Sequence, residues 1–181
     1  MNTFYENSFI VIDDEEQIQN IVLAYASDKF QKCYKASSGE EALDIIKGNE
    51  IDIAFCDIMM PGINGLETIE KILKISPHTI CIFATAYADK KNIHKALQLG
   101  AYDFLPKPFD PEYIQNCLSR CIELINSKKQ QREILEILLT NYSDTDPSKF
   151  FALEQNEQNK ILEGVLGVMR LKLLNYKIKK S

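Results

Sequence analysis

Four short runs of β-branched and apolar residues punctuate the first two thirds of the chain, and helical patterns lie between them. The runs are Phe9–Ile12, Ile51–Cys56, Thr79–Ala84 and Tyr102–Leu105. Runs of this kind are typical of strands buried on both faces, and their alternation with helices predicts a parallel sheet covered on both sides. We therefore expect an α/β domain with a doubly wound parallel sheet and right-handed crossovers.

Side chains that could bind a metal or take part in catalysis follow these runs closely. Asp13 and Asp14 follow the first run, Asp57 the second and Thr85 the third, while Lys107 comes shortly after the fourth. In open parallel sheets, binding and catalytic sites lie at the carboxyl ends of the strands. Three acids, a hydroxyl and an amine are therefore expected to meet in one pocket.

Such a pocket favours phosphoryl transfer. Crowded carboxylates are tolerated around a divalent cation, and a ligand set made of oxygen atoms suits Mg²⁺, which commonly shares a phosphate with one or two carboxylates. An aspartate can act as a covalent nucleophile. Lys107 would supply a compact positive charge and Thr85 a hydroxyl donor, because this reaction needs mainly positioning and charge neutralisation.

Four segments, taken together in this order and spacing, resemble the receiver domain of two-component response regulators. They are Val11–Glu15, Asp57–Gly65, Ala84–Ala86 and Phe104–Phe109. Each alone is weak, because an Asp-Asp pair is often a helix N-cap and a Pro-Gly pair is often only a turn. The resemblance covers roughly the first two thirds of the chain.

The resemblance implies a flavodoxin-like sheet of five strands in the order 2-1-3-4-5, with residues 1–126 forming the receiver. It implies that Asp57 accepts a phosphoryl group from a sensor histidine kinase. It also implies that Mg²⁺ is held by Asp14, Asp57 and the backbone carbonyl of Met59, with Asp13 acting mostly through water.

Further roles follow from the same resemblance. Thr85, Ala86 and Lys107 would contact the phosphoryl group, and Phe104 matches an aromatic position that moves inward as the threonine closes. The domain would assist its own phosphorylation and dephosphorylation without turning over a separate substrate.

Two positions are expected to tune hydrolysis of the phosphoryl group. By resemblance these are Met59 and Tyr87. A bulky Met should hinder an attacking water, which predicts slow hydrolysis.

Composition places this domain in a reducing compartment. Hydrophobic residues make up 45% of the chain, enough for a real core. The five cysteines are odd in number and lie within strand or helix patterns, which favours reduced thiols in a cytoplasm. The start, Met1–Glu6, lacks a basic region followed by an apolar one, and no apolar run reaches membrane-spanning length. We expect a cytoplasmic protein without a signal peptide or membrane partner.

The remainder, residues 127–181, is expected to form a helical extension. Its 10 basic and 7 acidic side chains give +3, against −8 for residues 1–126. A fifth helix should begin near Asp110–Glu112, with Asp as N-cap and Pro at the first position. Residues spaced by four and three then form a possible heptad seam: Ile114, Leu118, Cys121, Ile125, Lys128, Arg132, Leu135 and Leu139. The seam fits either a continuous helix that pairs two protomers or a receiver helix, a linker and a separate helix.

A last helix is expected from about Ser148 to Lys177, after a loop at Asn141–Pro147. Its apolar stripe comprises Leu162, Val165, Leu166, Met169, Leu173 and Tyr176. A two-helix hairpin is too small for a stable core of its own, so this stripe predicts a homodimerisation or partner-binding hairpin.

The tail lacks the marks of common output domains. It has no Gly-rich phosphate loop and no histidine that could carry a phosphoryl group, since His78 and His94 both lie in the receiver. No helix-turn-helix with a recognition helix is evident. The main hypothesis is a response regulator that switches dimerisation or partner binding. The alternatives are a transcriptional regulator with a divergent DNA-binding tail, and a scaffold whose contacts do not depend on Asp57.

Overall fold

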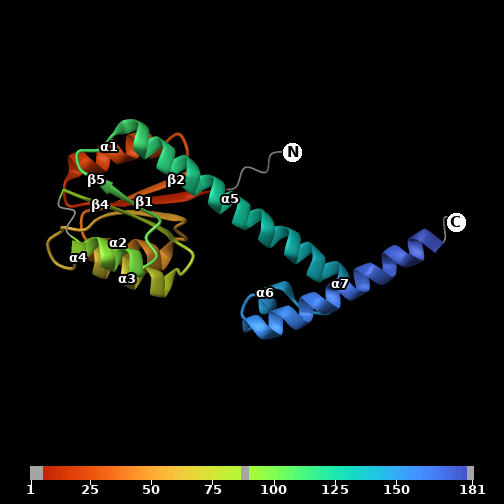
Figure 1. Ribbon diagram of the computed structural model, residues 1–181. Helices are drawn as coiled ribbons and strands as arrows, with labels where there is room; N and C mark the ends of the chain where they lie inside the picture. Colours follow the sequence, from red (N-terminus) through yellow and green to blue (C-terminus); the bar gives the residue numbers. More distant parts are fainter. Residues whose placement is uncertain (1–5, 87–89, 179–181) are drawn as a thin grey trace. The chain divides into compact units, whose positions relative to one another are not determined.

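The computed structural model describes residues 6–86 and 90–178. The chain forms two compact units, Met1–Ile125 and Asn126–Ser181. The first unit contains one parallel sheet in the order β2-β1-β3-β4-β5, as the resemblance implied (Figure 1). Its strands are β1 (Ser8–Ile12), β2 (Lys32–Ala36), β3 (Ile53–Asp57), β4 (Ile80–Thr85) and β5 (Asp103–Pro106).

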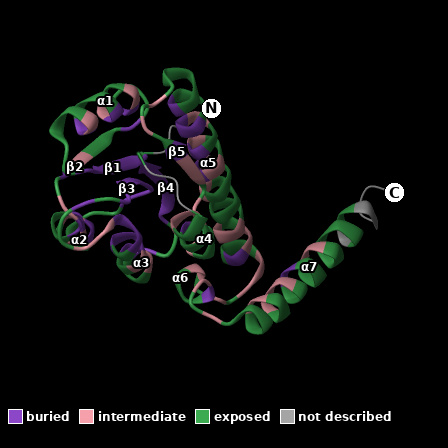
Figure 2. Cartoon of the chain, turned by 60° about the vertical axis from the view of Figure 1, so that its left-hand side comes forward, coloured by how far each residue is buried: buried purple, intermediate pink, exposed green. Residues whose placement is uncertain are grey.

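Helices cover both faces of this sheet. The helices of the first unit are α1 (Glu16–Ala26), α2 (Gly39–Gly48), α3 (Gly65–Ile75), α4 (Lys90–Gln98) and the first part of α5 (Pro111–Tyr142). One core cluster joins the sheet to α1 and α5, and the other joins it to α2, α3 and α4. Strands β1, β3 and β4 are consequently buried along their whole length (Figure 2).

Strand β2 differs from the other strands in its sequence. Its five residues are mostly exposed or half-buried, and only Ala36 is buried. It lies at the edge of the sheet and pairs with β1 alone. An edge strand needs no continuous apolar run, which is why the residue pattern does not reveal it.

Local signals explain where several helices begin. The Ser38 hydroxyl accepts from the Glu41 N–H at 3.2 Å, and the Glu41 carboxylate accepts from the Ser37 N–H at 2.7 Å, which is a variant of the capping box. Asp110 accepts from the Glu112 N–H at 2.9 Å, and Pro111 opens α5 as predicted.

Helix α5 is continuous for 32 residues, so the alternative with a linker between two separate helices is wrong. Its heptad seam is nevertheless covered within the chain. Ile114, Leu118, Cys121 and Ile125 lie in the receiver core, whereas Leu139 lies in a separate core of the second unit. The seam residues between these two cores are polar.

The second unit contains the end of α5, a short helix α6 (Pro147–Phe150) and α7 (Gln155–Ile178). Leu139, Phe150 and Val165 form its buried centre. Within residues 6–86 and 90–178, none of the helices has the length and apolar character needed to cross a membrane.

The last long helix begins at Gln155, so the predicted start near Ser148 is wrong. Asp146 caps the separate helix α6 by accepting from the Ser148 N–H at 2.9 Å, and the chain turns so that Phe150 is buried. The Gln158 amide then donates to the carbonyls of Phe150 at 3.2 Å and Leu153 at 3.0 Å. Burial of one aromatic side chain thus divides the expected helix in two.

Candidate functional site

The carboxyl ends of β1, β3 and β5 bring two acids and one amine into direct contact. The Lys107 Nζ lies 2.7 Å from an Asp13 carboxylate oxygen and 2.6 Å from an Asp57 carboxylate oxygen. Asp14 joins this group, because one carboxylate oxygen from each of the three aspartates lies within 4.8 Å of the others. Residues from three segments that are far apart in sequence therefore form one acidic pocket with a lysine at its edge.

Asp13 is held by the loop between β1 and α1. Its side chain accepts from the Glu15 N–H at 3.0 Å, and its own N–H donates to the Ala36 carbonyl at 3.1 Å. The buried Gln19 amide donates to the Asp13 carbonyl at 2.6 Å and to the Ala36 carbonyl at 3.2 Å. Gln19 thus fixes the loop that presents the acids, a role that its helical position in the sequence does not reveal.

Asp57 is held by the turn that joins β3 to α3. Its carboxylate accepts from the Met59 N–H at 3.1 Å, and the Gly65 N–H donates to the Ile58 carbonyl at 3.0 Å. A Cβ added at Gly65 would lie 1.9 Å from the Asp57 carbonyl oxygen. Only glycine therefore permits α3 to begin so close to the acid.

Strands β4 and β5 position the remaining polar groups. Thr85 ends β4, is buried, and lies opposite Pro106 in the parallel register. The Lys107 N–H donates to the Thr85 carbonyl at 2.8 Å. The backbones that carry the hydroxyl and the amine are thus joined directly beside the acids.

Burial and charge oppose one another in this pocket. Burial raises the pKa of Asp13, while the Lys107 hydrogen bond and charge counteract that effect only in part. Burial alone would lower the pKa of Lys107, but its hydrogen bonds to Asp13 and Asp57 raise the pKa above its usual value. The lysine is therefore an ammonium near neutral pH, and the raised pKa of Asp13 shows that its burial is not fully compensated.

A thiol lies next to the site but is not a competing nucleophile. Burial raises the pKa of Cys56 well above its usual value, and the Asp57 charge adds to this effect. Its Sγ donates to the Asp57 carbonyl at 3.2 Å. A protonated, buried thiol is a poor nucleophile, which leaves the carboxylates as the reactive groups.

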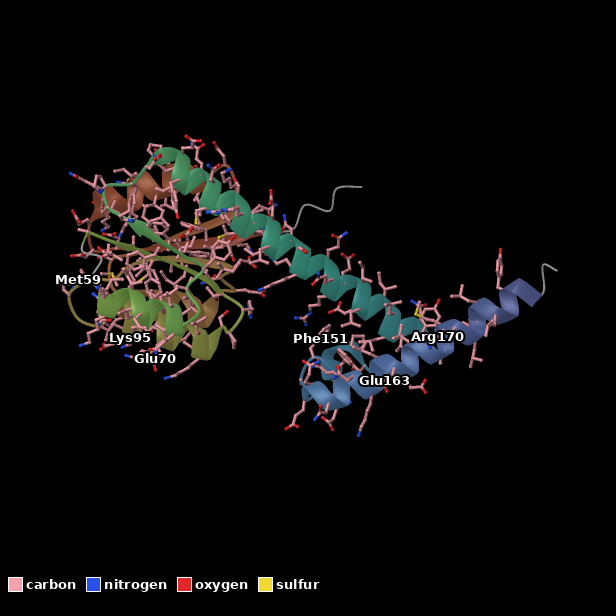
Figure 3. The ribbon with its side chains drawn as sticks, viewed as in Figure 1. Met59, Glu70, Lys95, Phe151, Glu163 and Arg170 are labelled. Carbon is pink, nitrogen blue, oxygen red and sulfur yellow. The ribbon has the colours of Figure 1, made fainter. Side chains whose placement is uncertain are left out.

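The other positions expected at the site have different environments. Asp14 and Ala86 are exposed, and Met59 is 58% exposed at the surface of the first unit (Figure 3). Phe104 is half-buried and packs on the core cluster shared by α2, α3 and α4. Tyr87 lies outside the described residues.

One further acid near the site was not anticipated. The Glu15 carboxylate lies 3.8 Å from the Lys107 Nζ and is largely exposed. The exposed side of the pocket is therefore acidic as well, which suits it to a cation.

The fold and the acidic pocket agree with the known proteins that this chain resembles in sequence. The family model described as the response regulator receiver domain matches residues 9–119. The response regulator SaeR of Staphylococcus aureus (strain USA300) is 32% identical over 138 residues, covering 74% of this chain and 60% of SaeR. The regulatory protein AtoC of Escherichia coli (strain K12) is 28% identical over 137 residues, covering 75% of this chain and 30% of AtoC. This chain therefore spans less than two thirds of the length of either relative.

Solved structures show the same fold. A CheY-like response regulator receiver domain protein from Methanospirillum hungatei JF-1 has a TM-score of 0.62 at 23% identity, covering 70% of this chain and 99% of that one. The DrrB response regulator of Thermotoga maritima, described as an OmpR/PhoB homolog, has a TM-score of 0.60 at 25% identity, covering 66% of this chain and 54% of that one. The family match spans well over half of the chain, and the parallel sheet and acidic pocket lie within it. This chain belongs to the response regulator receiver domain family of two-component signal transduction.

Proposed function

We propose that Asp57 accepts a phosphoryl group from a sensor histidine kinase and that the helical tail carries the resulting output. The observation that carries the first part is the contact of the Lys107 Nζ with both Asp13 and Asp57 inside a cluster of three acids. A carboxylate already paired with an ammonium can attack phosphorus while the neighbouring charges stabilise the transferred oxygens.

The acidic pocket fits Mg²⁺. Its donors are carboxylate oxygens close enough to share one ion, and burial has raised the pKa of Asp13 without a fully compensating partner. Asp14, Asp57 and the Met59 carbonyl would hold the ion directly, and Asp13 would hold it mostly through water. When bound, Mg²⁺ supplies positive charge to the phosphoryl oxygens.

The side chains and backbone groups of the protein then have separate roles in phosphoryl transfer. An Asp57 carboxylate oxygen forms a bond to phosphorus, the bond from phosphorus to the kinase histidine nitrogen breaks, and that nitrogen keeps the electron pair. Lys107 moves its hydrogen bond from the Asp57 carboxylate to a phosphoryl oxygen, and Thr85 and the Ala86 N–H donate to others. Closure of Thr85 makes room for Phe104 to turn inward, which changes the face made by α4, β5 and α5.

The reverse step is slow under this proposal. Met59 is largely exposed beside the acceptor and would hinder water that approaches the acyl phosphate. The domain therefore assists its own phosphorylation and dephosphorylation, and we propose that it acts in the cytoplasm.

Phosphorylation by a small-molecule donor such as acetyl phosphate tests the proposal. The full chain should gain one phosphoryl group, resolved on a phosphate-affinity gel, and Asp57→Asn or chelation of divalent cations should abolish the gain. Asp52→Asn is a matched control, because Asp52 lies just before the same strand and its carboxylate accepts from the Ser8 N–H at 2.8 Å, away from the pocket. Undiminished phosphorylation of Asp57→Asn would refute the assignment.

A further inference from the structure

The last half of α7 exposes more apolar surface than the second unit can cover. Leu166 is 54% exposed, Leu173 60% and Tyr176 59%. Together with the half-buried Leu162 and Met169 they are spaced by four, three, four and three residues. This spacing places all five on one stripe of the helix, which we call the α7 stripe.

The stripe continues beyond the core of the second unit. Leu162 and Met169 pack beside Leu139, Phe150 and Val165, and the Lys172 ammonium lies 4.6 Å from the Tyr142 ring centroid near the end of α5. Beyond Lys172, none of the α7 side chains that the structure describes belongs to this core. Contiguous apolar area of this kind on a small unit marks an interaction site.

Charge along α7 is arranged in two halves of opposite sign. Residues 155–163 carry two acidic and one basic side chain, so −1, whereas residues 170–178 carry three basic and no acidic ones, so +3. A second α7 running in the opposite direction would place each acidic half beside a basic half. A second α7 running in the same direction would place like halves together.

Two side chains at the edge of the stripe set the register of such a pair. Glu163 follows Leu162 and Arg170 follows Met169, so both occupy the same position of the heptad (Figure 3). No ion pair of Glu163 or Arg170 is found among the described residues. In an antiparallel pair centred between Leu166 and Met169, Glu163 of each protomer meets Arg170 of the other.

We infer that the α7 stripe pairs with the same stripe of a second copy, antiparallel, with Glu163 opposite Arg170 at both ends of the pair. The partner is a second copy because the heptad spacing and the charge halves of α7 complement themselves. The inference rests on the proposed output role of the tail, and it does not require that Asp57 be phosphorylated. It names the surface, direction and register through which two tails pair.

The mass of the full chain in solution is the first test. Light scattering should give twice the 20.7 kDa of one chain, with and without beryllofluoride and Mg²⁺. A single-chain mass under both conditions at micromolar concentration would overturn the inference.

Two matched substitutions on the same helix test the face. Leu173 and Leu171 are 60% and 63% exposed, but they lie on opposite sides of α7. Leu173→Glu should convert the dimer to monomer, whereas Leu171→Glu should leave the mass unchanged. Equal loss of dimer in both variants would show that the face is wrong, and an unchanged helical circular dichroism signal checks that each variant is folded.

A charge exchange tests direction and register. Glu163→Arg and Arg170→Glu should each weaken the dimer about tenfold, because each creates two like-charge pairs by symmetry. The double variant should recover the original dissociation constant to within about threefold. Additive weakening in the double variant would overturn the antiparallel register.

Separate readouts keep this inference distinct from the proposed function. Phosphorylation of Asp57 on a phosphate-affinity gel reports the receiver, and mass reports α7. A monomer that is phosphorylated normally would overturn the pairing alone. A monomer whose tail binds DNA with steep salt dependence would replace it with the DNA-binding alternative.

Discussion

The receiver and the tail differ in how they bury their apolar side chains. In the described part of the receiver, two clusters of sixteen buried residues each lie on opposite faces of one sheet. Among the tail residues that the structure describes, the core has three buried members, Leu139, Phe150 and Val165. The receiver thus has the core of an independent domain, whereas the tail is marginal without additional burial. The region that carries the chemistry is stable, and the region that we propose carries the output is the one that a partner can stabilise.

The largest expected contrast comes from removing one buried phenylalanine in each region. Phe55→Ala should lower the free energy of unfolding of the receiver by about 4 kcal/mol, because Phe55 is fully buried and packs edge-on against Phe109. Phe150→Ala should unfold the tail and leave the receiver transition unchanged. Hydrogen exchange followed by mass spectrometry would separate the two, and loss of protection in the receiver of Phe150→Ala would contradict their independence.

Two glycines give the next contrast, with opposite signs. Gly65→Ala should destabilise the receiver by about 3 kcal/mol and impair phosphorylation, since the new Cβ would collide with the Asp57 backbone. Gly164→Ala should stabilise the tail by about 1 kcal/mol, because nothing lies within 4 Å of its Cβ position and alanine favours a helix. Thermal unfolding of the two variants measures both effects, and a neutral Gly65→Ala would show that the loop after β3 can move.

Asp13 provides a smaller test of the acidic pocket. Its pKa is raised above 3.8 in the folded chain, mainly by burial, so the ionised form disfavours folding as pH rises through that range. Asp13→Asn should therefore be more stable than the parent at pH 7 without Mg²⁺, and the gain should vanish near pH 3, where the acid is protonated in both states. Melting curves at the two pH values measure this difference. Added Mg²⁺ should stabilise the parent more than the variant, because the variant loses the charge that Asp13 contributes through water. Equal stabilisation of both would argue against a role of Asp13 at the metal site.

Thiol labelling gives the smallest expected effect. Cys33 is exposed, and the other four cysteines are buried. Iodoacetamide at pH 8 should add one label to the native chain and five in denaturant. Labelling of Cys33 should accelerate toward pH 9, because partial burial holds its pKa above 9.0, whereas burial raises the pKa of Cys81 to about 12. Mass spectrometry counts the labels, and a second label on the native chain would indicate opening of a core.

Much of the fold and of the acidic pocket of the receiver could be predicted from the sequence. Four of the five strands were predicted from apolar runs. Three of them, β1, β3 and β4, are fully buried, and strands covered on both faces carry no alternation of apolar and polar residues. The acids Asp13, Asp14 and Asp57 could be placed together because parallel strands end at one edge of the sheet. Lys107 was expected in the same pocket on the same ground. Strand β2 could not be read in this way, and its place at the edge came from the resemblance.

Contacts between segments that are distant in sequence could be established only from the tertiary structure. Gln19 secures the loop of Asp13 through the carbonyl of Ala36, which belongs to another strand. The heptad seam of α5 predicted a helix, but whether its residues face a protomer or the chain's own cores depends on what packs against them. The break between α6 and α7 likewise depends on Phe150 finding a buried site beside Leu139 and Val165. Periodicity records which side of an element is apolar, whereas the identity of the covering surface is set by packing across the whole chain.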